Sequence, residues 1–250
     1  MKILKPNLGI FILSLVFILI PLIFFKTEDF WDGVSASYAF KTKDYFGFRE
    51  FTSQSALFIQ FFLYKIFFSF SELLNISYKY LISIYYFFII YFISIELHKI
   101  SKNVLGMDGY FSFLPSIIFI VMPIWSMLIS SIFIAHLSFA LLVLLGIKLY
   151  FHKNIFIKLF SILILFCSYE LKSNILFSIF LCFLYENCKF NLNFQIKYKK
   201  TFYLFIYNIL CFFIFNSILK TSGLWENYNS IINFLDWFNF KHFIWHAINY

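Results

Sequence analysis

Residues 26–43, KTEDFWDGVSASYAFKTK, directly follow the first hydrophobic run of the chain and hold its densest group of acids. Glu28, Asp29 and Asp32 lie within five residues of one another. Because long apolar runs flank this stretch, it is predicted to lie at a membrane surface. Two interpretations are open: a solvated loop in which Asp32 caps a short helix, or a loop that presents a catalytic acid.

The composition is that of an integral membrane protein. Of the 250 residues, 62% are hydrophobic and 25% aromatic, while 13% are charged. A soluble domain is about half apolar and about a quarter charged, so the lipid bilayer is the predicted partner of this chain. The net charge of +8 comes from basic residues at the ends of the hydrophobic runs, where the positive-inside rule favours them. No nucleic-acid partner is therefore expected.

No metal site is expected either. The cysteines lie in or beside hydrophobic runs without the spacing of metal ligands, which favours buried thiols over disulfides or zinc; they are Cys167, Cys182, Cys188 and Cys211. His242 and His246 are four residues apart, but the glutamate of a zinc-protease motif is missing between them. An aromatic helix at the membrane interface is the favoured interpretation of that pair.

Seven hydrophobic runs are predicted to cross a bilayer core of about 30 Å. No cleavage site follows the first, residues 8–25, so it is predicted to remain as an anchor. The others are residues 78–95, 110–127, 130–146, 155–168, 175–185 and 201–219. Residues 56–70 are also apolar, but this stretch is short and Gln60 and Lys65 interrupt it. It is predicted to be a helix that lies on the membrane surface.

The lysines predict the orientation of the runs. They concentrate at the N-terminus and in three connecting segments, residues 98–109, 148–158 and 186–200. The short turns 123–131 and 169–174 hold one lysine between them. Since short basic loops stay in the cytoplasm, the N-terminus is predicted inside and the C-terminus outside. The predicted fold is all-α: a polytopic membrane bundle of about seven helices with a long outer loop, residues 26–77, in a bacterial inner membrane.

Several motifs follow one another in a definite order. Asp32-Gly33 opens the first loop, and Asp44-Tyr45 comes about a dozen residues later. The apolar stretch SQSALFIQFFLYKIFFSFSELL, residues 53–74, holds Glu72 near its end, and Lys79 follows. Glu170-Leu171-Lys172-Ser173-Asn174 lies between the fifth and sixth runs. Over about residues 1–186 this order resembles the GT-C membrane glycosyltransferases, which include protein mannosyltransferases and lipid A aminoarabinose transferases.

The chain departs from that family at several points. Gly33 replaces a second acid, a Pro-Pro pair is absent, and Ser173-Asn174 replaces Gly-Pro. His136 stands where the family has an acid early in the fourth span. The family usually continues past seven spans, whereas this chain ends in a predicted outward-facing aromatic tail, residues 220–250. A minimal form, a fragment and an inactive relative are all open.

The resemblance implies an enzyme that moves a sugar from a polyprenyl-phosphate donor to a cell-surface glycan or lipid acceptor. Asp32 would be the base that takes the acceptor's proton, with Asp29 as a second candidate. Lys172 and His136 would steady the phosphate, and Lys79 stands where the family often has arginine. Asp32, His136 and Lys172 are expected to converge on one cavity at the outer face.

Other interpretations of these residues remain open. Lys172 can be a solvated charge in a turn with Glu170, and His136 can bond to Ser138 or Ser131. The alternative function is a non-catalytic membrane carrier, such as a polysaccharide flippase, or a partner subunit of polysaccharide export. Transporters usually place charges and broken helices at the middle of the membrane, whereas Asp32 and Lys172 are predicted at its rim.

Overall fold

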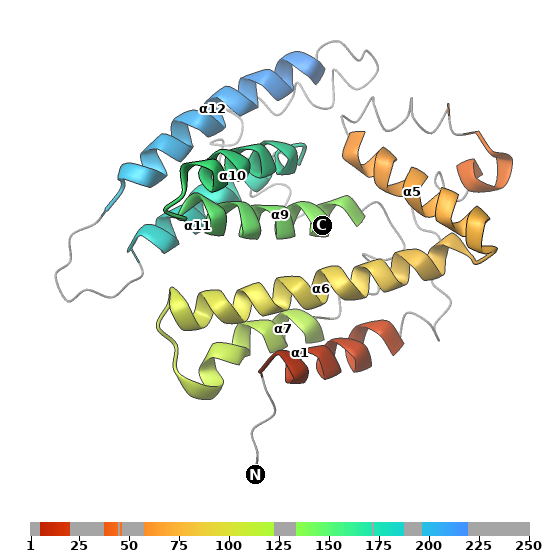
Figure 1. Ribbon diagram of the computed structural model, residues 1–250, viewed down its shortest axis with the longest axis horizontal. Coiled ribbons are helices and arrows are strands. Elements are labelled where there is room, and N and C mark those ends of the chain that lie inside the picture. Colours follow the sequence, from red (N-terminus) through yellow and green to blue (C-terminus); the bar gives the residue numbers. More distant parts are fainter. Residues whose placement is uncertain are drawn as a thin grey trace, which may run out of the picture.

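The computed structural model describes residues 6–20, 38–44, 46, 58–122, 134–171, 173–187 and 197–219. Every regular element in these ranges is a helix, as the sequence predicts (Figure 1). Several of the residues singled out above lie outside the described residues: Asp29, Asp32, Lys172, Cys188, His242, His246 and the tail 220–250.

The described helices follow the predicted hydrophobic runs closely. The first run forms α1 (Pro6–Ser14) and the π-helical η1 (Leu15–Leu19). The helix expected at residues 56–70 is α5 (Phe58–Leu74). The remaining helices are α6 (Tyr78–Asn103), the 3₁₀ helix η2 (Gly109–Phe113), α7 (Leu114–Val121), α9 (Ile134–Tyr150), α10 (Ile155–Ser168), α11 (Ser173–Asn187) and α12 (Lys199–Leu219).

Helix α6 is the centre of the fold. It has 26 residues, which at 1.5 Å per residue is about 39 Å. Among the described residues it is the one helix that is long and apolar enough to cross a membrane, and shorter apolar helices accompany it. Figure 1 shows α6 between two groups of helices, with α1 and α7 on one side and α9 to α12 on the other. Tyr86 and Ile90, at its middle, are almost fully buried.

Two pairs of polar contacts set how α6 meets its neighbours. Ser116 of α7 donates to the backbone oxygen of Ser94 (2.6 Å), and His98 contacts the backbone oxygen of Ser112 in η2, which leads into α7 (3.1 Å). Residue numbers rise along one helix as they fall along the other, so α7 runs antiparallel to α6. Against α9, Tyr85 bonds to Ser138 (2.7 Å) and Glu96 to Lys148 (3.0 Å). Here both numbers rise together, so α9 runs parallel to α6.

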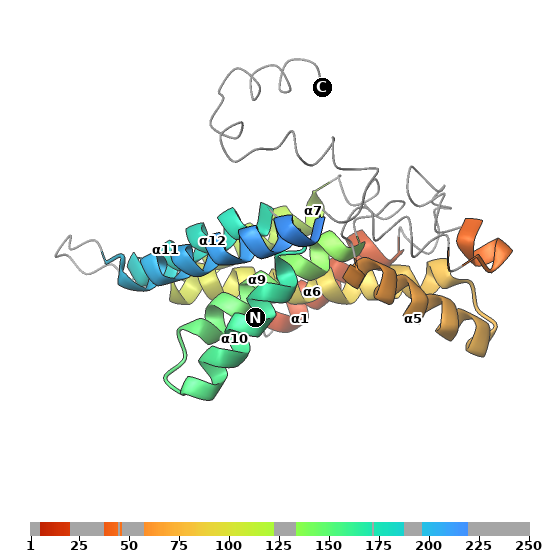
Figure 2. The same cartoon turned by 90° about the horizontal axis from the view of Figure 1, so that it is seen from above.

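The other group is built around α9 and α10, which pack side by side (Figure 2). A Cβ on Gly146 of α9 would stand 2.8 Å from the side chain of Leu165 of α10, so the glycine permits this close approach. Helices α11 and α12 run antiparallel. The Asn208 side-chain amide donates to the Ser178 hydroxyl (3.0 Å) and to the backbone oxygen of Ile175 (3.2 Å).

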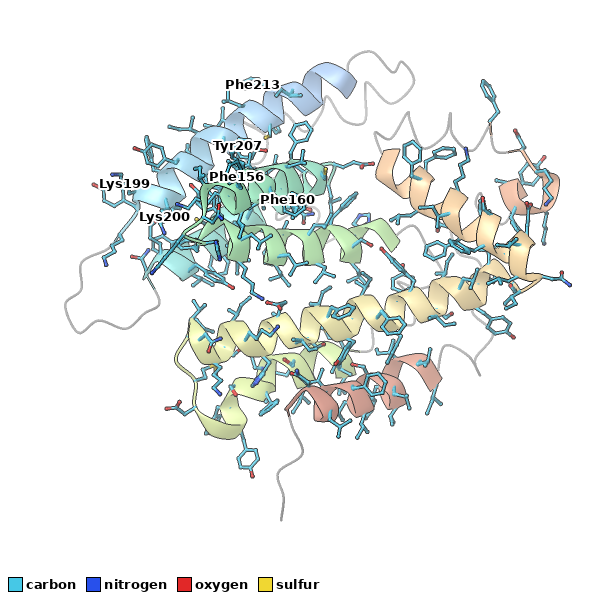
Figure 3. The ribbon with its side chains drawn as sticks, in the orientation of Figure 1. Phe156, Phe160, Lys199, Lys200, Tyr207 and Phe213 are labelled. Atoms are coloured by element: carbon cyan, nitrogen blue, oxygen red, sulfur yellow. The ribbon has the colours of Figure 1, made fainter. Side chains whose placement is uncertain are left out.

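The interior of the bundle is mostly apolar but also holds a set of polar side chains. Most of the buried polar side chains are serines, and several of them donate to the backbone one turn earlier, as Ser94 does to Ile90 (2.7 Å). That bond satisfies a hydroxyl without a second helix. Large apolar side chains stand outside. Phe156 and Phe160 of α10 and Phe213 of α12 are each more than half exposed (Figure 3).

Candidate functional site

The described helices have two chemically different ends. We call the N-terminal turns of α6 and α9, with the C-terminal turn of α5, the loop end, because the segment before α5 joins the bundle there. We call the C-terminal turns of α6 and α9, with the N-terminal turn of α12, the lysine end. The residues that the sequence singles out as a site and that the structure describes, Lys79 and His136, are both at the loop end.

A short helix, residues 38–42, attaches the first loop to this end. Phe40 lies 5.2 Å from the ring of Phe68 on α5 and 4.8 Å from the ring of Tyr78 on α6. Ala39 beside it is 2% exposed. Lys43 forms an ion pair with Glu72, at the end of α5. The loop that carries the predicted acids is therefore joined to the corner between α5 and α6.

That corner determines where Lys79 lies. Helix α5 ends in a turn in which Asn75 has φ of 52°, a left-handed conformation that asparagine tolerates better than most residues. The Ile76 N–H donates to the backbone oxygen of Ser71 (3.1 Å) and closes the turn. Helix α6 then begins at Tyr78, so Lys79 lies in its first turn and is half-buried.

His136 is the third residue of α9 and is half-buried. Two residues later, Ser138 bonds to Tyr85, and the Tyr85 ring packs edge-on against Phe67 of α5 (5.1 Å). Lys79 precedes Tyr85 by six residues, which is about 9 Å of helix rise. Helices α5, α6 and α9 thus bring Lys79 and His136 to the same end. The sequence suggested Ser138 or Ser131 as a partner for His136; in the structure the Ser138 hydroxyl bonds to Tyr85, and Ser131 lies outside the described residues.

The turn between α10 and α11 is held by buried polar side chains. The Asn174 amide donates to the backbone oxygen of Ser168 (3.0 Å), and the Tyr169 hydroxyl bonds to Ser178 (2.8 Å). Lys172 lies outside the described residues, so its part in the predicted cavity stays a prediction. The residues flanking it are described, and they confirm a tight turn between helices that end at Ser168 and begin at Ser173.

Helix rise relates this turn to His136. Leu165 of α10 packs on Gly146 of α9. Tyr169 is four residues beyond Leu165, about 6 Å of rise, and His136 is ten residues from Gly146, about 15 Å. Measured along the axes of α9 and α10, the start of the turn after α10 is therefore offset from His136 by about 9 Å.

At the lysine end the structure reveals two acidic residues with defined partners that were not among the residues predicted from the sequence. Glu96 is buried and pairs with Lys99 (2.7 Å) and Lys148 (3.0 Å). Its signal in the sequence is an acid at the end of an apolar run with a lysine three residues later. Glu186 accepts from the backbone N–H groups of Lys200 and Thr201 (both 2.9 Å) and from the Thr201 hydroxyl (2.7 Å).

The Glu186 bonds have an electrostatic consequence. Partial burial acts to raise the pKa of the Glu186 carboxyl, but the N–H groups of Lys200 and Thr201 and the Thr201 hydroxyl outweigh it and hold that pKa below its ordinary value. Such a carboxylate at the start of α12 also faces the positive end of the helix dipole. Its role is to join α11 to α12. Within the described part of the chain, no three His, Cys, Asp or Glu side chains gather as metal ligands would.

The described geometry therefore separates two kinds of polar groups. At the lysine end, Glu96 pairs with lysines and Glu186 accepts hydrogen bonds from the start of α12, and both acids join helix ends. At the loop end, a histidine and a lysine from different helices lie near the attachment of an acidic loop. No protein family, no curated protein and no solved structure matches the chain.

Proposed function

We propose that this chain is an integral membrane protein whose predicted runs form seven spans. The support is its apolar surface: large phenylalanine, isoleucine and leucine side chains are exposed on α1, α5, α10 and α12, and most of the buried polar residues are serines. Small polar residues at helix contacts are typical of membrane bundles, where lipid removes the hydrophobic drive between helices. In water, so extensive an apolar surface would drive aggregation.

The lysine end is proposed to face the cytoplasm. The C-terminal turns of α6 and α9 and the start of α12 are in contact, through Glu96 with Lys148 and through Lys200 over the Phe151 ring (4.2 Å). One side of the membrane therefore receives the basic segments, as the positive-inside rule requires. The loop end then faces outward. Phe67 packs on Tyr85 and Phe68 on Tyr78 of α6, so α5 lies beside the proposed outer part of α6. We propose, as its sequence predicts, that α5 lies along the membrane surface.

We further propose that the chain is a membrane glycosyltransferase. It would move a sugar from a polyprenyl-phosphate donor to a glycan or lipid acceptor at the outer surface of a bacterial inner membrane. One observation carries the proposal: the loop that holds Asp29 and Asp32 is attached, through Phe40, to the same end of the bundle as Lys79 and His136. A carboxylate and cationic groups at one membrane face are the parts that this transfer needs.

In the proposed reaction, the oxygen of the acceptor hydroxyl attacks the anomeric carbon of the donor sugar. Asp32 takes the proton of that hydroxyl during the attack. The bond between that carbon and the phosphate oxygen breaks, and the electron pair leaves with the phosphate. Lys172, His136 and Lys79 stabilise the charge that grows there. Asp29 is the second candidate for the base.

The test is transfer by membrane vesicles that contain the full chain and cell-envelope glycolipids. Polyprenyl-phosphate mannose and polyprenyl-phosphate aminoarabinose serve as the two donors. Asp32→Asn should lower the rate by about 10²–10⁴-fold, because it removes a general base while keeping the side-chain shape. The control is Asp108→Asn, an exposed acid that precedes η2 and forms no capping bond. Full activity of the Asp32→Asn variant, or no transfer by the parent chain, would overturn the proposal.

A further inference from the structure

Helix α5 has two faces of different character. Phe61, Tyr64 and Phe68 are buried toward α6, whereas Phe62 and Phe70 are more than half exposed on the opposite side. Side chains three and four residues apart share a helix face, so the exposed face follows residues 62, 65, 66, 69, 70 and 73. All but two of these are large and apolar; the exceptions are Lys65 and Ser69.

This face borders a hollow of about 320 Å³, lined by Phe62, Lys65, Ile66, Ser69 and Phe70. Lys65 is exposed there, and no carboxylate in the described part of the chain pairs with it. Lys43 and Lys148, by contrast, form ion pairs with Glu72 and Glu96. Lys65 is instead a cation among aromatic and aliphatic side chains on one open face of α5.

We propose that the hollow binds an anionic membrane lipid. The Lys65 ammonium pairs with the phosphate of the headgroup, and the Ser69 hydroxyl, one turn further along the same face, donates to a phosphate oxygen. An acyl chain lies along Phe62, Ile66 and Phe70. Two features favour this ligand. The Lys65 ammonium attracts an anion. The apolar side chains around it favour an anion that carries hydrocarbon over a soluble ion.

The site is separate from the proposed transfer site. Lys65 lies on the face of α5 that points away from α6, while Phe67 on another face of α5 contacts Tyr85. The inference requires that the bundle is in a membrane, but it does not require transferase activity. Lipid binding and sugar transfer are therefore measured in separate experiments, and the failure of one proposal does not imply the failure of the other.

The experiment uses the full chain in phosphatidylcholine vesicles with a Leu73→Trp reporter. Leu73 is 78% exposed on the same face and does not line the hollow. Quenching of the reporter is compared between brominated phosphatidylglycerol, which is anionic, and brominated phosphatidylcholine, which is neutral overall. The native tryptophans are the same in every variant, so a difference between variants that share the reporter is assigned to the substitution.

The parent reporter protein should prefer phosphatidylglycerol by about five-fold, the effect of one lysine near a charged lipid surface. Lys65→Gln should abolish the preference, and Lys65→Arg should keep it because the charge remains. The control Lys102→Gln removes an exposed lysine at the lysine end and should leave the preference unchanged.

Three results would overturn the proposal. The first is an equal response of the parent to both lipids, and the second is an unchanged preference after Lys65→Gln. The third is displacement of the lipid when inorganic phosphate replaces chloride at constant ionic strength, which would assign the site to a soluble anion. Exposed residues such as Lys65 tolerate substitution, and circular dichroism confirms that each variant keeps the helix content of the parent.

Discussion

At the scale of single residues, carboxylates near helix ends do most of the joining. Glu186 receives three hydrogen bonds from the first turn of α12, whose N–H groups have no partner within their own helix. Asn187 beside it accepts from the Lys197 N–H (2.7 Å) and donates to the Lys197 backbone oxygen (2.7 Å). Two adjacent residues thus fix the approach of α12 to α11.

Glu186→Gln should destabilise the protein by about 1 kcal/mol at neutral pH, the usual cost of losing a helix cap. The pKa of Glu186 in the folded protein is lowered, so its stabilisation is complete above the ordinary glutamate value, about 4.3. It disappears as the pH falls through the lower folded pKa. The difference in unfolding midpoint between parent and variant, measured in detergent, should therefore shrink below pH of about 4.

The control for this measurement is Asp108→Asn, an exposed acid without a capping bond. It should shift the midpoint little at any pH. If Glu186→Gln behaves like this control at neutral pH, the carboxylate does not stabilise the start of α12.

At the scale of helices, two parallel neighbours are fixed in register by a polar contact near each end. Tyr85 and Ser138 meet near the start of α9, and Glu96 and Lys148 meet near its end. The spacing is eleven residues on α6 and ten on α9, so the helices stay in step over that length. Helix α10 then packs on α9 at Gly146, where the backbones approach most closely because no Cβ intervenes.

Gly146→Ala should destabilise the pair α9 and α10. The new Cβ would stand 2.8 Å from two atoms of Leu165, a side chain that is fully buried and has little room to move. Overpacking of this kind costs about 1–3 kcal/mol. Gly9→Ala in α1, where a Cβ would meet nothing within 4 Å, should be neutral or stabilising by up to about 1 kcal/mol. Thermal unfolding of both variants in detergent checks the pair, and equal midpoints would contradict the proposed close contact.

At the scale of the whole molecule, the chain sorts its charges between two ends. The lysine end gathers helix ends that are far apart in sequence, as the contacts of Glu96 with Lys148 and of Tyr150 with the Lys200 backbone oxygen (3.3 Å) show. The loop end receives the 38–42 helix and begins α6 and α9. This separation is what a membrane protein needs to hold one orientation.

Single cysteines in a chain whose native cysteines are replaced by serine should reveal the orientation. In intact cells, Phe46→Cys should react with a membrane-impermeant maleimide, while Lys102→Cys and Lys197→Cys should react only after the membrane is opened. The same experiment predicts outward labelling near Asn227, which lies outside the described residues. Labelling of Lys102→Cys from outside would reverse the orientation and remove the acidic loop from the outer surface.

The sequence alone determined where the helices lie, although α6 and α9 continue past the predicted residues 95 and 146 to Asn103 and Tyr150. Residues 155–168 are predicted as one run and form α10 with the same bounds, because an apolar run between polar segments is a local property. The lysine pattern also placed the segments after α6, α9 and α11 on one side, and the structure brings these helix ends together.

Tertiary structure alone decided which helix faces meet. The predicted alternation of spans made α6 and α9 parallel, but it did not predict their register, the pairing of Glu96 with Lys148 or the packing of α5 against α6. The physical reason is that α6 and α9 are apolar on nearly every side, so no stripe in their sequences marks the contact face. For the candidate site, the sequence could assign His136 and Lys79 to one end of the bundle. The Tyr85–Ser138 contact beside them depends on how three helices cross, which only the folded chain determines.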